Sequence, residues 1–191
     1  MILGLGIDPI LVTVTGSGTR FTTRVPLATA RAQSMNALAT CIGLPVEAIR
    51  TDHHAPITGG LDTDFVLVEL AVQTIVAKAR SRADTFWETE CPGTDRLATL
   101  IYIRDGFDIR ASVFQYLGGI PEDPATGSTA AVLTGYRGQI DGLSATFRIT
   151  QGAEMSRPSK ITTEVAVENA VPTAVSVEGQ DIRIMEGSLT L

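Results

Sequence analysis

The stretch EDPATGSTAAVLTGY, residues 122–136, decides the fold. Its acidic start contains a proline, small and hydroxyl-bearing residues follow, and the apolar run from Ala130 to Leu133 predicts a helix. In the first turn of a helix the backbone N–H groups have no intrahelical acceptor, and the helix dipole is positive there. Together with a glycine that allows close approach, this start predicts an anion site that suits a substrate carboxylate.

Five residues of this stretch are candidates for a functional site. Thr126, Gly127, Ser128 and Thr129 are the candidate substrate-binding residues, because their backbone N–H groups and hydroxyls surround the start of the helix. Asp123 is the candidate catalytic residue, since a carboxylate beside an anion site can hold an amine or hydroxyl or transfer a proton. Capping is the alternative interpretation, because Asp, Ser and Thr before an apolar run are also ordinary capping residues.

Outward from this helix the chain alternates between predicted strands and helices. Turn signals at Gly16-Ser17-Gly18 and Asp105-Gly106 predict two hairpins. Helical spacing predicts one helix over 27–42, ended by Gly43, and another over 72–79. The remaining expectations are strands at 10–15, 20–25, 65–70, 97–103, 107–114, 145–150, 161–168, 174–177 and 182–184, a short helix over 45–49, and a loop at His53-His54. With no short repeat and no low-complexity linker, residues 1–191 are expected to form a single α+β domain.

The composition restricts the class of protein. The 191 residues carry 15 basic and 21 acidic side chains and only two lysines, which argues against nucleic acid as a partner. No apolar run is long enough to predict a membrane span. The two cysteines, Cys41 and Cys91, are typical of a reducing compartment, so a cytoplasmic location is expected. The run Asp52-His53-His54 lacks a third ligand at a suitable spacing, so no metal site is expected.

Two longer motifs resemble those of a known family. The run GIPEDPATGS, residues 119–128, is similar to the signature of the PhzF-like (phenazine biosynthesis-like) isomerases and epimerases. The run QGAEMSRPS, residues 151–159, resembles that family's QGxEMGRPS element. The two motifs stand in the family's order and at its distance, and weaker similarity extends from about Asp8 to the terminus. The resemblance therefore covers most of the chain.

The resemblance implies a diaminopimelate-epimerase-like fold. In this fold each of two similar halves wraps a curved, mainly antiparallel sheet around a central helix, and the active site lies between the halves. Asp123 and Ser128 would then contact substrate, and the backbone N–H groups around 126–129 would hold its carboxylate. A glutamate from the first half acts as the proton shuttle in the family, and no cofactor is required.

The elements that the family's first half contributes are not found in this sequence. Glu47 and His53-His54 stand in contexts unlike the family's glutamate segment and glycine–histidine element, so the chain resembles the C-terminal half of PhzF-like proteins alone. Three explanations remain open. Two copies form a homodimer that rebuilds the cleft, a separate chain supplies the first half, or the reading frame is truncated or degenerate.

The expected function is that of a PhzF-like isomerase or epimerase that acts by carbon–proton transfer on a small carboxylate-bearing metabolite. Activity is expected only as a dimer or with a partner that supplies the first half. The alternative is a non-catalytic carboxylate-binding protein or a vestigial half-protein. A two-thiol racemase is not expected, because no cysteine follows Cys91. Cys41 and Tyr136 are expected to pack in the core, and Glu154 and Arg157 to form a structural pair behind the cleft.

Overall fold

The computed structural model describes residues 2–3, 10–15, 18–23, 28–32, 34–60, 64–86, 98–116, 121–182 and 185–188. Its strands are β1 (Ile2–Leu3), β2 (Ile10–Thr15), β3 (Gly18–Thr23), β4 (Ala28–Ala32), β5 (Ile57–Gly60), β6 (Asp64–Glu69), β7 (Ala98–Asp105), β8 (Asp108–Gln115), β9 (Ala145–Gln151), β10 (Ser159–Glu168) and β11 (Val171–Gly179). In the described part of the chain these strands form one sheet, ordered β1-β2-β3-β11-β10-β9-β8-β7-β6-β5-β4. The pairs β6–β7 and β8–β9 are parallel, and the other neighbours are antiparallel.

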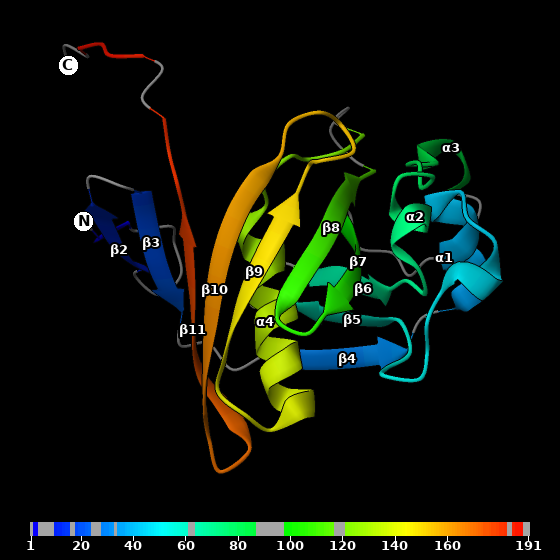
Figure 1. The fold of residues 1–191 in the computed structure, drawn as a ribbon, viewed down its shortest axis with the longest axis horizontal. Helices are drawn as coiled ribbons and strands as arrows, with labels where there is room; N and C mark the ends of the chain where they lie inside the picture. Colours follow the sequence, from blue (N-terminus) through cyan, green and yellow to red (C-terminus); the bar gives the residue numbers. More distant parts are fainter. Residues whose placement is uncertain are drawn as a thin grey trace.

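The sheet curves around one helix, α4 (Gly127–Asp141), as Figure 1 shows. This helix packs against β5 and β6 and also against β9, β10 and β11. Six strand spacings separate β5 from β11 in the sheet, which is about 29 Å along a flat sheet. A helix about 10 Å across touches both strands only if the sheet bends around it. The expected fold, a curved and mainly antiparallel α+β sheet wrapped around a central helix, is therefore confirmed.

Both faces of the sheet are buried over β6, β7 and β8, because alternate residues of these strands belong to two different hydrophobic clusters. In β6, Phe65 and Leu67 belong to the hydrophobic cluster under α4, whereas Val66 and Val68 belong to a second cluster on the opposite face. Side chains of successive strand residues point to opposite faces, so a fully apolar run such as this one needs cover on both. The strand expected at 65–70 is confirmed, and it is covered on both faces.

The second face is covered by short helical segments. These are α1 (Met35–Ile42), the 3-10 turn η1 (Val46–Ala48) and α2 (Gln73–Val76), and α3 (Ala83–Phe86) packs against α1. Helix α1 begins where the Ser34 hydroxyl accepts a hydrogen bond from the N–H of Ala37, and it ends at Gly43, whose φ of 66° suits glycine. Leu38 and Cys41 of this helix are buried in the second cluster, which confirms the expected core position of Cys41.

Several expected elements are confirmed and others are wrong. Both hairpins, the short helix after Pro45 and the strands of the last third occur near their expected positions. The expected helix over 27–42 is wrong in its first part, because Ala28–Ala32 forms strand β4 against β5. The expected helix over 72–79 is a single turn. Ile182 lies outside any strand, and residues 183–184 and Cys91 lie outside the described residues. No helix of the described ranges is both long and apolar enough to cross a membrane.

Candidate active site at the start of the central helix

The helix start predicted to bind an anion lies at one end of α4. Thr126 occupies the N-cap position with extended backbone, but its hydroxyl makes no capping hydrogen bond. Instead, the hydroxyl donates a hydrogen bond of 2.9 Å to the Asp123 carboxylate. The side chain that would ordinarily satisfy the first-turn N–H groups is therefore used elsewhere, and helix geometry gives those groups no intrahelical acceptor. The Thr126 side chain therefore does not cap α4.

The four predicted binding residues differ in exposure. Ser128 is exposed and Gly127 is half-buried, whereas Thr126 and Thr129 are buried. The Thr129 hydroxyl donates to the carbonyl oxygen of Thr126 over 3.0 Å, so this side chain is part of the helix's internal structure. Toward a ligand, the helix start thus offers the Ser128 hydroxyl and backbone N–H groups.

Asp123 is held in one orientation by three hydrogen-bond donors. Its carboxylate accepts from the N–H of Ala125 (3.2 Å), the Thr126 hydroxyl (2.9 Å) and the Gln115 side-chain amide (3.3 Å). Its own N–H donates to the carbonyl of Val113 in β8, over 2.9 Å. The carboxylate is thus fixed between β8 and the helix start, half-exposed, where it can accept a further hydrogen bond from a ligand.

Gln151, at the end of β9, holds the whole turn from Asp123 to Thr126. Its side-chain amide donates to the carbonyl of Asp123 (2.7 Å) and to the hydroxyl of Thr126 (3.0 Å), and its oxygen accepts from the N–H of Thr126 (3.3 Å). The residue is fully buried. Sequence reasoning assigned no role to Gln151, because the residues that it binds are 25 and 28 positions away in the chain.

A close backbone contact joins the same two segments. Gly152 has a φ of 73°, and a Cβ atom there would lie 2.9 Å from the Cα of Pro124. Only glycine fits both the backbone angle and this approach. The second family-like motif therefore folds back onto the first and fixes its position.

The expected pairing of Glu154 with Arg157 is wrong. Glu154 is nearly buried and pairs with Arg110 of β8, over 2.8 Å. Ser156, in the same turn, has a φ of 60°, an angle that non-glycine residues rarely adopt. The similar family element QGxEMGRPS carries a glycine at this position, which matches the left-handed backbone.

A buried polar cluster lies in another part of the protein, at the end of β6. Glu69 is 1% exposed and lies 2.7 Å from Nδ1 of His53 and 3.4 Å from the hydroxyl of Tyr102. His54 contacts that same hydroxyl, over 2.6 Å, and packs edge-on against the ring of Tyr136. The loop expected at His53-His54 is confirmed, but its contacts with Glu69 had no signal in the sequence. Among the described residues no group of three metal-ligating side chains is placed to hold a metal ion.

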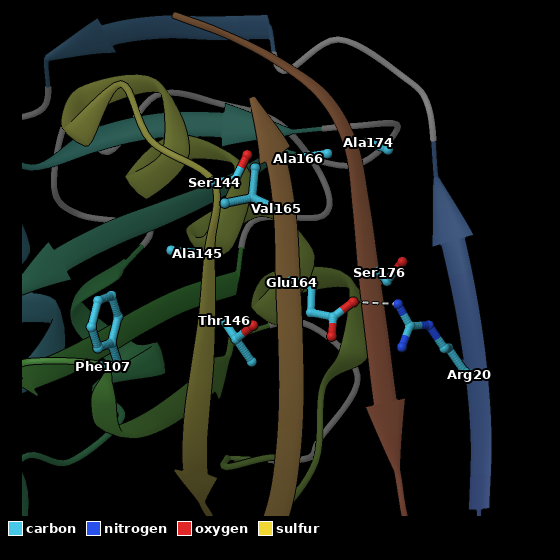
Figure 2. A pocket seen from close by; sticks show the side chains of 10 residues that line it. All are labelled: Arg20, Phe107, Ser144, Ala145, Thr146, Glu164, Val165, Ala166, Ala174 and Ser176. Atoms are coloured by element: carbon cyan, nitrogen blue, oxygen red, sulfur yellow. Dashed lines mark hydrogen bonds and ion pairs between the residues drawn. The ribbon is translucent and has the colours of Figure 1, made fainter. Parts of the chain in front are cut away.

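A hollow of about 710 Å³ lies on the outer face of β9, β10 and β11, away from α4 (Figure 2). Thr146, Glu164 and Ser176 stand side by side across the three strands, and Glu164 forms an ion pair with Arg20. Phe147, next to Thr146 in sequence, belongs to the core under α4, and Val165 contacts both this core and the hollow. Asp123 and the helix start are not among the residues that line this hollow.

Comparison with known proteins finds one matching family and a curated relative. A model of the family described as phenazine biosynthesis-like protein matches residues 5–187. A curated relative, an uncharacterized isomerase of Mesorhizobium japonicum, is 28% identical over an alignment of 165 residues, and the match covers 80% of this chain and 54% of the relative. The chain thus spans about half the length of this curated relative.

Solved structures with the same fold are also longer than this chain. A PhzF-family phenazine biosynthesis protein from Bacillus anthracis superposes with a TM-score of 0.72 at 19% identity, over 90% of this chain and 61% of that one. A predicted epimerase from Pseudomonas aeruginosa gives a TM-score of 0.70 at 20% identity, over 94% of this chain and 62% of that one. At these identities the likeness establishes the fold.

Proposed function

Because the chain belongs to the phenazine biosynthesis-like (PhzF-like) protein family, we propose that it forms part of an isomerase or epimerase that moves a proton on carbon in a small carboxylate-bearing metabolite. The observation that carries this proposal is the start of α4. There the Thr126 hydroxyl is turned to Asp123, and the first-turn N–H groups are left for a ligand. The curated relative is named an isomerase, which supports the reaction class.

The roles within the proposed site follow from its geometry. The N–H groups of Gly127, Ser128 and Thr129, at the positive end of α4, bind the substrate carboxylate, and the Ser128 hydroxyl adds a hydrogen bond. The fixed Asp123 carboxylate accepts a hydrogen bond from an amine or hydroxyl of the substrate, or takes its proton. No cofactor takes part in this scheme.

The proposed reaction needs a second acid–base group on the other side of the substrate. We propose that a second copy of this chain, or another polypeptide segment, supplies it, and that residues 1–191 form one domain equivalent to the C-terminal half of the family fold. A homodimer with two Asp123 side chains at one cleft is the form tested first. The low cysteine content supports a cytoplasmic location as part of the same proposal.

Solvent-deuterium incorporation tests the proposal. The purified chain is incubated in D₂O with candidate amino and hydroxy acids, and mass spectrometry follows exchange at carbon, while light scattering gives the solution mass. We expect exchange that Asp123→Asn lowers by about 10²-fold or more. Asp108→Asn is the matched control, because that carboxylate pairs with Arg148 on the surface. Full exchange in Asp123→Asn would overturn the assignment.

A non-catalytic carboxylate-binding protein is the second candidate. The observation that favours it is the full set of donors on Asp123, which also suits a purely structural residue. This candidate predicts that carboxylates raise the melting temperature without any deuterium exchange. The same experiment therefore separates the two functions.

A further inference from the structure

Strand β2 lies beyond the part of the sheet that packs against α4. In the sheet order, β3 separates β2 from β11, and β11 is the strand on that side that packs against the helix. Figure 1 shows β2 and β3 beyond β11, and the segment that follows β11 leaves the sheet on the same side. The Thr19 hydroxyl of β3 donates to the carboxylate of Asp181 over 2.8 Å, so the start of that segment lies beside the β2–β3 hairpin.

Large apolar side chains are exposed on this side of the protein. Leu11 and Val14 of β2 are each 60% exposed, and Ile182, next to Asp181, is 85% exposed. A single exposed apolar residue is common on a protein surface, whereas several in adjoining segments indicate a contact surface. We call Leu11, Val14 and Ile182 the hairpin surface.

Strand β2 also has an open edge. Strand β1 pairs with Ile10 and Leu11, and in the described part of the chain residues 12–15 have no strand neighbour on the side away from β3. The sequence of β2, ILVTVT, is rich in β-branched residues and contains no charge and no proline. Charged residues and proline are the means by which natural edge strands prevent pairing. The edge of β2 is therefore suited to pairing with a further strand.

The charges around this edge suit a second copy of the same strand. Across a two-fold axis each copy presents the same residues to the other, so any charged residue near the axis meets its own kind. Like charges that face each other in paired strands are destabilising, and the chain has a net charge of −6. Strand β2 carries no charge, and Arg20 of β3 pairs with Glu164 and Glu178 of the same chain. Pairing of β2 with its copy therefore brings no like charges of these strands together.

The hairpin surface borders the candidate active site. The Phe21 ring of β3 lies against Gly127 at the start of α4, where an added Cβ atom would be 3.2 Å from Cε1 of the ring. Phe21 pairs in register with Val12, and Val14 lies two residues further along the same face of β2. A partner that covers Val14 therefore adjoins the helix start.

We propose that a second copy of this chain pairs along β2, strand against strand, and covers the hairpin surface. The inference deepens the proposed function, because it gives the surface through which a second copy reaches the helix start, and it rests on that function for this catalytic role. The pairing itself follows from the open edge, the exposed apolar side chains and the lack of charge on β2.

Light scattering over a range of protein concentrations, together with amide hydrogen exchange, tests the proposal. We expect a reversible dimer in which the edge amides of residues 12–15 exchange more slowly as the protein concentration rises. Val14→Lys changes an exposed side chain and places a lysine from each copy in the interface, so the dissociation constant of the dimer should rise at least about tenfold. Leu143→Lys is the matched control, because Leu143 is also an exposed apolar residue but follows the opposite end of α4, and it should leave the dissociation constant unchanged.

Two results would overturn the inference. A monomer at every concentration would exclude a second copy as the partner and would leave the proposed function to another polypeptide segment. A dimer that Val14→Lys and Leu143→Lys weaken equally, or that neither weakens, would place the contact on another surface. A dimer with the expected protection of β2 but without deuterium exchange at carbon would support this inference and contradict the proposed function.

Discussion

At the scale of single residues, Gln151 decides whether the site keeps its shape. Replacing it with alanine removes three hydrogen bonds and leaves the buried N–H of Thr126 and the partly buried carbonyl of Asp123 without their partner. We expect Gln151→Ala to lower the free energy of unfolding by about 2–4 kcal/mol. Urea denaturation measures this, with Gln139→Ala on the exposed side of α4 as the control, for which a change within about 0.5 kcal/mol is expected. Equal stability of the two variants would contradict the role of Gln151.

Ser156 gives a prediction of the opposite sign. Its φ of 60° costs a residue with a Cβ atom about 1–2 kcal/mol, whereas glycine adopts this angle freely but loses about 0.5–1 kcal/mol of extra chain entropy on folding. We therefore expect Ser156→Gly to raise the free energy of unfolding by about 0.5–1 kcal/mol, or the melting temperature by about 2 °C. Ser159→Gly in strand β10 is the control, because Ser159 does not have a positive φ. Glycine there relieves no strain and only adds the entropy loss, so the melting temperature should fall. A fall for both variants would show that Ser156 is not strained.

At the scale of secondary-structure elements, the cluster around Glu69 ties the loop with His53 and His54 to strands β6 and β7. Burial lowers the pKa of His54 in the folded protein below its ordinary value of 6.5. The unfolded chain therefore binds more protons below pH 6.5, and the free energy of unfolding falls as the pH falls. The slope from this residue is at most about 1.4 kcal/mol per pH unit.

A comparison of the wild-type protein with His54→Gln isolates this effect. Glu122 has the opposite effect on the pH dependence of stability, because burial raises its pKa and the folded state then binds more protons than the unfolded chain. Glu122 is present in both proteins, so its effect cancels in the comparison. We expect the stability advantage of the wild type to shrink between about pH 7.5 and about pH 5.5. Urea denaturation at several pH values measures it, and two parallel curves would contradict the prediction.

The fit of α4 onto β10 depends on Gly138. A Cβ atom at this position would lie 2.6 Å from Cγ2 of Val165. We expect Gly138→Ala to lower the free energy of unfolding by about 1–3 kcal/mol, even though alanine is the better helix former. The double variant Gly138→Ala with Val165→Ala should recover part of this loss, because the truncated side chain leaves room for the new methyl group. Additive losses in a double-mutant cycle would show that the two residues do not interact.

At the scale of the whole molecule, local patterns predicted what local interactions determine. The hairpin at Asp105-Gly106 and the start of α4 are set by neighbouring residues, and both were predicted correctly. Strand β4 was predicted as helix, because alanines favour a helix until pairing with β5 decides otherwise. In the site, Asp123 was found through its own motif, whereas Gln115 and Gln151 reach it from other strands. Contacts of this kind leave no periodicity in the sequence.

The two hydrophobic clusters lie on opposite faces of one sheet, and neighbouring residues of the same strands supply both. Phe65 and Leu67 pack toward α4, while Val66 and Val68 pack toward α1. Loss of one cluster therefore exposes a face of strands on which the other depends, and the two should unfold in a single transition.

Leu38→Ala tests this coupling. Leu38 is 1% exposed in the cluster with α1, so the truncation should lower the free energy of unfolding by about 2–5 kcal/mol. Because we expect one cooperative unit, the slowest-exchanging amides of α4, on the other face of the sheet, should lose protection by the same free energy. Hydrogen exchange followed by NMR measures this, and Leu143→Ala, at a side chain that is 67% exposed, is the control. Unchanged protection in α4, together with two thermal transitions, would mean that residues 1–191 contain two independently stable units and not the single domain proposed above.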